Sequence, residues 1–473
     1  MSTAERDTIA EPPVEASASN GTTNRRQPFP QGFLDTISTG WADRPESLPA
    51  ARAQAAYAAA RRAAVSAAFP GKRLVFPAGP LKQRSNDTDY VYRPHSAFAH
   101  LTGWASDTQP DSVLVLAPID GGHDATLYFR ERADRTTSEF YSDATIGEFW
   151  IGPRPSLAGV AADLDIATAH LDELTSDEGE LVLEADEALT RFVSELRLVK
   201  DEFEIAELRH AVEITANGFD DVIRELPAAI AHARGERVVE GVFHRRARED
   251  GNGEGYDTIA ASGPHACYLH WTRNDGTVAP GDLILIDAGV EAESLYTADI
   301  TRTIPVSGTF TEVQRRVYET VREAADAAFA AAKIGARFRD VHAAAMKVIA
   351  ERTAEWGLLP VTAEEALDAE KGGQQRRYMV HGTSHHLGID VHDCAQARRE
   401  MYYNGILAPG MVFTIEPGLY FQIDDLTVPA ELRGIGVRIE DDILMTEDGP
   451  VNLSAGIPRT ADEVEAWIAR LQG

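Results

Sequence analysis

Five metal-ligating side chains, placed around short apolar runs, constrain the fold of this chain more than any other feature. Asp287, Glu416 and Glu440 each follow an apolar run, and Asp299 and His385 lie between them in the sequence. An ionised carboxylate is costly to bury unless it is paired or neutralised. Four carboxylates in apolar surroundings, together with a histidine, therefore require cations. We interpret the set as a dinuclear metal site.

An internal repeat supports this interpretation. The segments APGDLILIDAG (279–289) and APGMVFTIEPG (408–418) match in Ala, Pro, Gly, Ile and the final Gly, and Asp287 stands opposite Glu416. Each copy has the pattern of a turn, a buried strand and a carboxylate at the strand's end, and a second carboxylate follows later in the chain. The repeat predicts two structural halves that each bring two carboxylates to a shared centre. A chance match over so short a segment is the alternative.

The side-chain types in this set indicate hydrolytic chemistry. Carboxylates suit hard divalent ions, and an added imidazole shifts the preference toward Mn²⁺, Co²⁺, Zn²⁺ or Fe²⁺. Four carboxylates balance two divalent cations, and two such ions ~3.5–4 Å apart lower the pKa of a shared water and polarise a carbonyl. His270, His381, His392 and Arg438 lie near the ligands in the sequence, and the histidines could stabilise a tetrahedral intermediate or move a proton. No G-x-S-x-G motif for a serine nucleophile is present.

Taken singly, several of these residues have a simpler structural explanation. Asp287, before a glycine-containing turn, could be a turn former, Asp299 could cap a strand, and Glu440 could be surface acid beside two aspartates. The histidines of 381–392 could lie in a partly exposed loop. Glu416 is harder to explain in this way because glutamate is a poor turn residue. The metal-site interpretation depends on the whole set in its order.

Length and composition predict a two-domain globular protein. The chain has 473 residues, of which 44% are hydrophobic and 25% charged, which is long for a single core. We expect a disordered tail over residues 1–33, which contain almost no large apolar side chains. A smaller α/β domain is expected over 34–199. An α+β domain over 200–473 follows, because its helices are grouped beside an antiparallel-looking sheet.

Hydrophobic periodicity predicts the individual elements. Residues 201–225 are expected to form an amphipathic helix that Pro227 ends, and the arginines of the Ala-rich stretch 49–69 indicate a surface helix. Thr311 with Gln314 forms a capping box that opens a helix. The other expected helices run over 187–199, 236–248 and 337–355, and the capped one ends near 332. The expected strands are 73–76, 112–117, 125–129, 180–183, 256–262, 283–288, 299–306, 411–416 and 435–446.

Charge and cysteine content exclude several classes of protein. The formal net charge of −30 argues against binding to nucleic acid or to an anionic membrane surface, since both require clustered Lys and Arg. No apolar run reaches the roughly 20 residues of a membrane helix, and the N-terminus lacks the features of a signal or transit peptide. We therefore expect a cytoplasmic protein. Cys267 and Cys394 fit a reducing compartment and are interpreted as small buried residues rather than ligands.

From about residue 200 to the end, the chain resembles the pita-bread metallopeptidases, which include aminopeptidase P, prolidase and methionine aminopeptidase, with creatinase as a relative. The resembling segments are CYLHW (267–271), LILIDAG (283–289), ADITRT (298–303), HGTSHHLGIDVHD (381–393), TIEPGLY (414–420) and GVRIEDD (436–442). RSNDTDYVYRPHSAFAHLTGW (84–104) and SVLVLAP (112–118) are similar to the N-terminal domain of aminopeptidase P and prolidase, which methionine aminopeptidases lack.

The resemblance implies a role for each candidate residue. Asp287 would hold one ion, His385 and Glu416 the other, and Asp299 and Glu440 would bridge both. Glu416 would also be the general base. His270, His381 and His392 would line the substrate cleft, with His392 stabilising the intermediate, and Arg438 would support the hydrogen bonds near Glu440. Mn²⁺ is the metal usual for this branch.

The implied function is that of a Xaa-Pro aminopeptidase, in which a metal-bridging hydroxide cleaves the bond between an N-terminal residue and a following proline. The expected substrates are peptides with proline at position 2, and the N-terminal domain would supply contacts for a homo-oligomer, a dimer or a tetramer. A prolidase acting on Xaa-Pro dipeptides is the nearest alternative, although no group that would hold the free proline carboxylate is identified. A non-catalytic peptide-binding protein and a metal-independent creatinase are disfavoured because all five ligand positions are filled.

Two features of the sequence differ from the pattern of the pita-bread metallopeptidases or leave it ambiguous. Eleven residues separate Asp287 from Asp299, whereas the family pattern has ten. We expect a bulge or longer loop to absorb the extra residue. His386 stands beside His385, and the H-G-x-S-H spacing favours His385 as the ligand.

Overall fold

The computed structural model describes residues 29–44, 47–86 and 88–473. Most of the predicted disordered tail, up to residue 28, lies outside the described residues, and helix α1 (Gln31–Ile37) begins within its last part. The predicted domain limits at residues 34, 199 and 200 stay predictions.

The chain divides into two compact units, which are described separately. Unit 1 comprises Met1–Ser47, Leu81–Tyr92 and Glu131–Ser156, and unit 2 comprises Leu48–Pro80, Arg93–Arg130 and Leu157–Gly473. All the predicted site residues belong to unit 2.

Unit 1 is a small group of short elements with an aromatic core. Phe140 and Tyr141 are buried, and the ring of Tyr141 meets that of Phe33 edge-on, with centroids 5.2 Å apart. Besides α1, its elements are β2 (Gln83–Ser85), β3 (Thr88–Asp89), α4 (Ser138–Ser142) and α5 (Glu148–Ile151).

Unit 2 begins with a five-stranded mixed sheet in the order β6-β5-β4-β1-β7. β4 pairs antiparallel with both β1 and β5, while β6 and β7 pair parallel with β5 and β1 at the two edges. The strands are β1 (Leu74–Pro77), β4 (Val113–Ile119), β5 (Gly122–Phe129), β6 (Ala167–His170) and β7 (Leu181–Val182). The helices of this part are α2 (Gln54–Ala68), α3 (Ser96–Thr102), η2 (Leu171–Glu173), α6 (Leu157–Leu164) and α7 (Glu187–Leu196). The sequence pattern predicts all of these strands except β6.

The prediction that the arginines of residues 49–69 mark a surface helix is wrong for two of the three. Arg61 and Arg62 are buried. Arg61 donates hydrogen bonds to the Asp201 carboxylate at 2.7 Å and to the His100 carbonyl at 3.0 Å, and Arg62 donates to the Leu101 carbonyl at 2.8 Å. Periodicity places charged residues in solvent, but a long side chain can reach a polar partner on another element.

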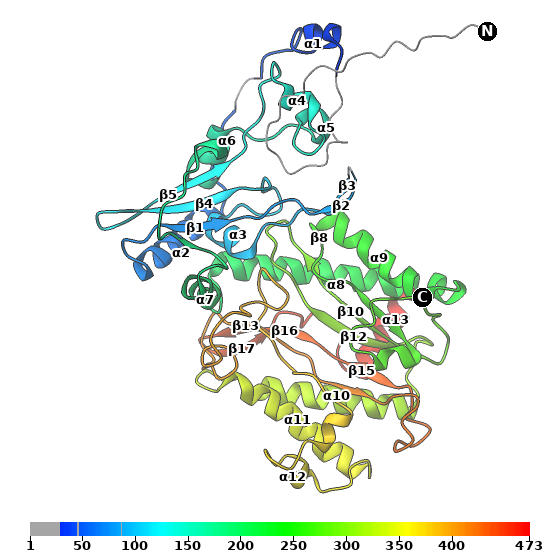
Figure 1. Ribbon diagram of the computed structural model, residues 1–473. Coiled ribbons are helices and arrows are strands. Elements are labelled where there is room, and N and C mark those ends of the chain that lie inside the picture. Colours follow the sequence, from blue (N-terminus) through cyan, green and yellow to red (C-terminus); the bar gives the residue numbers. More distant parts are fainter. Residues whose placement is uncertain (1–28, 45–46, 87) are drawn as a thin grey trace, which may run out of the picture. The chain divides into compact units, whose positions relative to one another are not determined.

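Two pairs of long helices dominate the rest of unit 2 and lie on either side of its strands (Figure 1). α8 packs on α9, and α10 packs on α11. The predicted capping box of Thr311 and Gln314 opens α10. The helices are α8 (Glu202–Ala231), α9 (Gly235–Asp250), η3 (Gly263–Cys267), α10 (Glu312–Ala331), α11 (Phe338–Glu355), α12 (Ala363–Ala366), η4 (Gln374–Arg377) and α13 (Ala461–Gln472).

The prediction that Pro227 ends the first long helix is wrong, because α8 continues to Ala231. Proline has no N–H with which to bond the carbonyl four residues earlier, here that of Ile223. Gln472, from the C-terminal helix α13, donates its side-chain N–H to that carbonyl at 3.0 Å. The acceptor that proline leaves free is therefore satisfied from another element, which sequence periodicity does not reveal.

The strands between the helix pairs contain one antiparallel pairing twice, β10 with β12 and β13 with β16, although the third strand joins β10 in one sheet and β16 in the other. In the first half, β10 pairs antiparallel with β12 and β9, and in the second half β13 pairs antiparallel with β16, which also pairs with β17. Two further ladders, β11 with β8 and β14 with β15, are also antiparallel. The strands are β8 (Gly253–Glu254), β9 (Ile259–Ser262), β10 (Leu283–Ala288), β11 (Val290–Glu291), β12 (Ile300–Pro305), β13 (Val412–Ile415), β14 (Gly418–Tyr420), β15 (Gly436–Arg438), β16 (Asp441–Thr446) and β17 (Gly449–Asn452).

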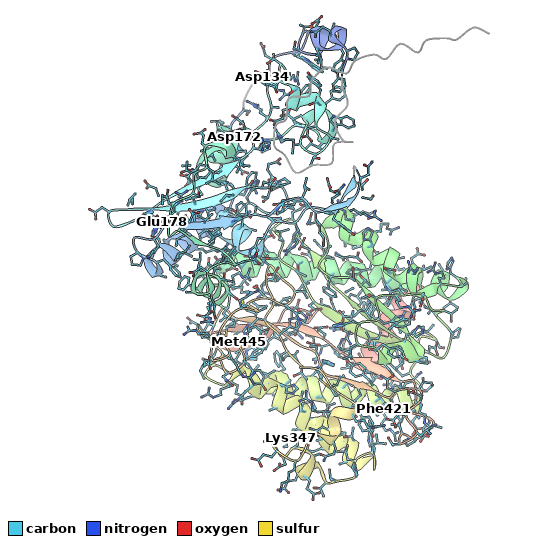
Figure 2. The ribbon with its side chains drawn as sticks, viewed as in Figure 1. Asp134, Asp172, Glu178, Lys347, Phe421 and Met445 are labelled. Carbon is cyan, nitrogen blue, oxygen red and sulfur yellow. The ribbon has the colours of Figure 1, made fainter. Side chains whose placement is uncertain are left out.

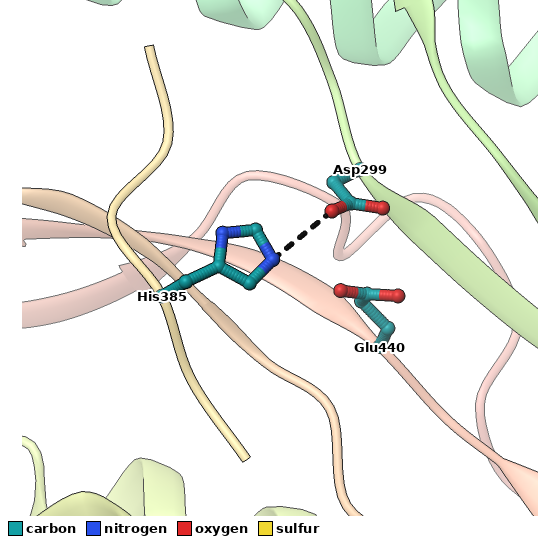
Figure 3. Close-up of side chains that lie close together, drawn as sticks. All are labelled: Asp299, His385 and Glu440. Carbon is teal, nitrogen blue, oxygen red and sulfur yellow. Dashed lines mark ion pairs between the residues drawn. The ribbon is translucent and has the colours of Figure 1, made fainter. Parts of the chain in front are cut away.

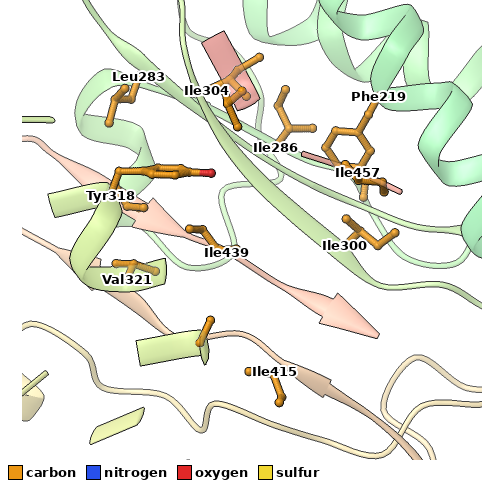
Figure 4. Packing of buried hydrophobic residues seen from close by; sticks show 14 of the residues in the cluster. Phe219, Leu283, Ile286, Ile300, Ile304, Tyr318, Val321, Ile415, Ile439 and Ile457 are labelled. Carbon is orange, nitrogen blue, oxygen red and sulfur yellow. The ribbon is translucent and has the colours of Figure 1, made fainter. Parts of the chain in front are cut away.

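A continuous apolar core joins the helices to these strands. Figure 4 shows Phe219 of α8 near Ile286 and Ile300 of the first sheet, and Tyr318 and Val321 of α10 near Ile439. Buried side chains such as Phe421 and Met445 contrast with exposed charged residues such as Asp172, Glu178 and Lys347 (Figure 2). Among the described residues, no helix is both long enough and apolar enough to cross a membrane.

Candidate metal centre and active-site cleft

The first half of unit 2's strand repeat places two aspartates side by side. Asp287 lies in β10, and Asp299 directly precedes β12, its antiparallel neighbour. The hydroxyl of Tyr256 lies 2.7 Å from Asp287 Oδ1 and 2.5 Å from Asp299 Oδ1. Gly289 permits the close return of the chain, because an added Cβ there would lie 1.7 Å from the Ala298 carbonyl oxygen.

The loop between these aspartates accommodates the extra residue that the sequence contains. Leu295 adopts a left-handed conformation (φ 72°), and its N–H donates to the Ala292 carbonyl at 2.8 Å. The Ala292 N–H donates in turn to the Tyr296 carbonyl at 2.9 Å. A tight loop therefore takes up the additional length, and Asp299 faces the same centre as Asp287.

The second half places two glutamates in the equivalent positions. Glu416 directly follows β13, and Glu440 directly precedes β16, the antiparallel neighbour of β13. The predicted single strand over 435–446 is wrong, because β15 ends at Arg438 and β16 begins at Asp441. Glu440 lies in this break, where its N–H donates to the Thr301 carbonyl at 3.1 Å. Both halves thus present one carboxylate at a strand's end and one at the start of the neighbouring strand, as the internal repeat predicts.

Three side chains from the two halves form a buried group that could hold a metal ion. Asp299, His385 and Glu440 each offer a ligand atom, and these atoms all lie within 4.8 Å of one another (Figure 3). His385 Nε2 is 3.2 Å from an Asp299 carboxylate oxygen and 3.7 Å from Glu416 Oε1. Asp287 is joined to Asp299 through the hydroxyl of Tyr256, which contacts both carboxylates.

The electrostatics of this group fit a cation site. Burial raises the pKa of Glu440 well above its ordinary value, and the charges of Asp299, Glu416 and Asp287 raise it further. Burial also raises the pKa of Glu416 to about 8, although His385 and Arg438 oppose the shift. These carboxylates therefore resist ionising together unless positive charge is added, and two divalent cations would add it.

Arg438 anchors a hydrogen-bonded frame behind the carboxylates. Its guanidinium pairs with Asp287, donates to Thr301 Oγ1 at 3.1 Å and donates to the Tyr420 hydroxyl at 3.2 Å. Thr301 Oγ1 donates to Glu440 Oε2 at 2.6 Å. The expected support of Glu440 by Arg438 therefore runs through Thr301, while the direct partner of Arg438 is Asp287.

The three histidines expected to line the cleft differ in how they are held. His381 Nε2 lies 2.8 Å from the Tyr420 hydroxyl, and its Nδ1 lies 3.5 Å from Glu416 Oε2. His392 is exposed, and its ring stacks on that of His385 with centroids 4.1 Å apart. His270 is also exposed. All three line the same cleft.

The side chains of His385 and His386 lie in different surroundings. His386 is buried in an aromatic pocket, where its ring stacks on Phe338 with centroids 4.6 Å apart and meets Tyr402 edge-on. Neither ring nitrogen of His386 has a hydrogen-bond partner among the described residues, and burial lowers its pKa to about 3. His385 alone of the pair faces the carboxylates.

All the predicted site residues line one cleft of about 650 Å³. They are Asp287, Asp299, His385, Glu416, Glu440, His270, His381, His392 and Arg438. Sequence reasoning missed Tyr256, Thr301 and Tyr420, which tie these residues together. Thr301 and Tyr420 lie within the segments ADITRT and TIEPGLY, so their position in a motif was an available signal, whereas Tyr256 gives none. Cys267 and Cys394 are buried free thiols, as predicted.

Two protein-family models and several curated proteins match this chain. Residues 206–447 match Metallopeptidase family M24, and residues 58–189 match Aminopeptidase P, N-terminal domain. The chain is 52% identical over 463 residues to Xaa-Pro aminopeptidase 1 of Streptomyces coelicolor, covering 93% of this chain and 92% of that protein.

Two solved structures share the architecture. Aminopeptidase PepP of Pseudomonas aeruginosa superposes with a TM-score of 0.76 at 29% identity, covering 89% of this chain and 99% of that chain. The low-pH form of aminopeptidase P of Escherichia coli gives a TM-score of 0.76 at 31% identity, covering 89% of this chain and 100% of that chain. The predicted fold, an α/β N-terminal domain followed by an α+β pita-bread domain, is confirmed.

Proposed function

The chain belongs to metallopeptidase family M24, and we propose that it is a Xaa-Pro aminopeptidase, which releases the first residue of peptides that carry proline at the second position. The observation that carries the proposal is the convergence of five metal-ligating side chains, three histidines and Arg438 on one cleft. Two relatives named Xaa-Pro aminopeptidase, each 52% identical, support the substrate class, since this chain covers 92% and 96% of their lengths.

The proposed cofactor is a pair of divalent ions, with Mn²⁺ as the first candidate and Co²⁺, Zn²⁺ and Fe²⁺ as alternatives. Asp287 would hold one ion, His385 and Glu416 the other, and Asp299 and Glu440 would be shared. A donor set of carboxylates with one imidazole suits these ions, and the raised pKa values of Glu416 and Glu440 indicate a site that lacks positive charge. When bound, the ions would lower the pKa of a water and polarise the substrate carbonyl.

The protein's own groups are proposed to handle the protons and the substrate. Glu416 would accept the proton of the attacking water, since its carboxylate lines the cleft with its Oε1 3.7 Å from His385 Nε2. Although His392 is exposed as a whole residue, its ring stacks on His385 in the cleft, and desolvation there together with the charge of His385 lowers its pKa. A neutral imidazole would therefore be available to hydrogen-bond the substrate oxygen. Arg438 would hold Asp287 in place by pairing with it, and Tyr420, which accepts a hydrogen bond from Arg438, would hold His381 through its hydroxyl.

The cleft favours an amino-terminal substrate over a proline dipeptide. Both kinds of substrate carry a free ammonium, which acidic groups attract, and a proline nitrogen without N–H, so only the group that follows the proline carbonyl distinguishes them. A prolidase needs a cation for the free proline carboxylate. Among the described residues that line the cleft, Arg438 is the one Arg or Lys, and it is already paired with Asp287. This observation favours the aminopeptidase. The homo-oligomeric state and the cytoplasmic location stay predictions.

A product assay by mass spectrometry tests the proposal. Metal-stripped protein, with and without added Mn²⁺, is given an Ala-Pro-Ala tripeptide and an Ala-Pro dipeptide, with Glu440→Ala as the inactive control. Metal-dependent release of the first residue from the tripeptide, with weak action on the dipeptide, is the expected result. Cleavage confined to the dipeptide would establish a prolidase instead, and no cleavage of either would contradict the proposal.

A further inference from the structure

Glu236, on α9, is a buried carboxylate that the proposed chemistry does not use. The residue is fully buried. Its Oε1 accepts hydrogen bonds from the Ser262 N–H at 2.9 Å and from His265 Nδ1 at 2.7 Å. Its Oε2 accepts from the Trp271 indole N–H at 2.9 Å and from the Gly276 N–H at 2.6 Å. The carboxylate is thus saturated by donors from a single stretch of chain.

That stretch, residues 262–276 (the 262–276 loop), forms one wall of the cleft. It contributes Leu269, His270 and Thr272 to the lining. After Ser262, the last residue of β9, the loop contains one short helical segment, η3, and no other regular structure, so its shape depends on bonds to its neighbours. Glu236 binds it near both ends and at Trp271, next to His270.

The indole of Trp271 is held from two directions. Its ring stacks on His265 with centroids 3.9 Å apart, and the Arg273 guanidinium lies 5.0 Å from the ring centre. His265 is itself bonded to Glu236. His270, between these anchored neighbours, makes no side-chain hydrogen bond with any described residue, so its direction depends on the backbone around it.

We propose that Glu236 is a positioning residue that fixes the 262–276 loop so that His270 faces the substrate in the cleft. The inference rests on the proposed function, because it assigns Glu236 a part in the placement of a substrate-contacting histidine. It acts through Trp271 and His265 and touches neither substrate nor metal ligand.

The geometry requires a carboxylate at this position. A carboxylate is an acceptor at both oxygens, and each oxygen here receives two donors. The amide of glutamine would turn an NH₂ group toward two of those donors and leave them unsatisfied. The packing leaves little room for adjustment, since a Cβ added at Gly276 would lie 2.7 Å from Glu236 Oε2 and from the His265 ring.

Hydrogen exchange on the full-length, metal-loaded protein tests the positioning directly. Glu236→Gln should raise amide exchange in peptides from the 262–276 loop by roughly tenfold, while peptides from β10 and β12 exchange as in the wild type. Glu249→Gln, an exposed glutamate on the same helix, is the control. Unchanged exchange in the loop would overturn the proposal, whether or not the protein cleaves Xaa-Pro peptides.

A double-mutant cycle with His270 tests the consequence for activity. Glu236→Gln should lower kcat/KM for Ala-Pro-Ala by roughly 10- to 100-fold with the bound-metal content unchanged. Added to His270→Ala, it should lower kcat/KM by no more than about 3-fold further. Full additivity of the two losses, or loss of metal from Glu236→Gln, would show that Glu236 acts elsewhere and would overturn the proposal.

A milder variant keeps the test decisive if Glu236→Gln folds poorly. Trp271→Phe removes one of the four donors and leaves the carboxylate in place, so a smaller loss with the same dependence on His270 is expected. Independence from His270 would contradict the proposal. If the wild-type protein releases no first residue from Ala-Pro-Ala, the proposed function fails, and the exchange measurement still decides the role of Glu236.

Discussion

Glu416 and His385 face each other in the cleft, with Glu416 Oε1 3.7 Å from His385 Nε2. Burial raises the pKa of Glu416 from 4.5 to about 8. Burial alone would lower the pKa of His385, but its hydrogen bond to Asp299 and the charges of Asp299 and Glu416 raise it from 6.5 to about 9. Since both pKa values increase on folding, these two groups bind more protons in the folded metal-free protein than in the unfolded chain.

This pair predicts how the stability of the metal-free protein depends on pH. A group with a raised folded-state pKa stabilises the fold at low pH and loses that contribution as the pH rises through the folded value. The Tm of chelator-treated protein should therefore fall as the pH rises from 7.5 to 9, since the folded pKa values are about 8 and about 9. Buried histidines with lowered pKa values, such as His381 and His386, act in the opposite sense, but mainly below this range. Added metal should remove most of this slope.

The Glu416→Gln variant is the control for this pH dependence, because an amide does not titrate in this range. Differential scanning calorimetry of both proteins, with and without chelator, makes the comparison. A Tm of the metal-free wild type that stays level or rises over this range would contradict the assignment.

Tyr420 predicts a second effect at the scale of one residue. Its hydroxyl receives a hydrogen bond from Arg438 at 3.2 Å and lies 2.8 Å from His381 Nε2. Tyr420→Phe removes both contacts and should lower kcat/KM for an Xaa-Pro tripeptide by roughly tenfold or more, since orientation in the site is lost. Steady-state kinetics measure the change.

Tyr402→Phe is the matched control for Tyr420→Phe. The Tyr402 hydroxyl accepts from the His386 N–H at 3.1 Å and does not line the cleft. Activity should stay within about 3-fold of the wild type, because the substrate-facing groups are untouched. Equal losses from the two variants would contradict the role assigned to the Tyr420 hydroxyl.

At the scale of elements, buried ion pairs tie the connection between α7 and α8 to the segment that follows His392. Lys200 Nζ lies 3.1 Å from Asp393 Oδ2, and Arg197 Nε lies 3.2 Å from Asp393 Oδ1. Asp393 and Lys200 are almost inaccessible to solvent. A buried pair gives little net stability when compared with apolar residues, but the loss of one partner leaves a charge poorly compensated.

Lys200→Met should therefore lower the free energy of unfolding by about 3 kcal/mol. Urea denaturation measures this change. Lys347→Met, on the exposed face of α11 where Lys347 pairs with Glu351 at 3.6 Å, should change it by less than about 0.5 kcal/mol. Equal changes in the free energy of unfolding for the two variants would show that burial does not make the Lys200–Asp393 pair more important for stability than an exposed pair.

Across the whole molecule, sequence reasoning succeeded where chemistry and local pattern coincide. Asp287 and Glu416 are recognisable because each ends an apolar strand, and the internal repeat relates them. Asp299 and Glu440 follow from the same repeat, and the structure shows why: Asp299 directly precedes β12, the partner of β10, and Glu440 directly precedes β16, the partner of β13. The fold class was predictable for the same reason, since the repeat and the grouping of the helices can both be recognised in the sequence.

The parts that sequence reasoning missed depend on contacts between distant elements. Tyr256 joins the two aspartates from a segment with no motif of its own. Arg61 can be buried because the Asp201 carboxylate and the His100 carbonyl accept its hydrogen bonds. Pro227 can stay within α8 because the Gln472 side chain donates to the Ile223 carbonyl in place of the N–H that proline lacks. Hydrophobic periodicity within one segment does not indicate which hydrogen-bond partners another segment supplies.

The central claim, that this chain is a dinuclear metal-dependent Xaa-Pro aminopeptidase, is tested most directly by one titration. Mn²⁺ is added stepwise to the metal-stripped protein while release of the first residue from Ala-Pro-Ala is followed. The account predicts no release without metal and a rise that levels off at two ions per chain, because four carboxylates balance two divalent cations. Release that needs no metal, or no release at any metal content, would contradict it.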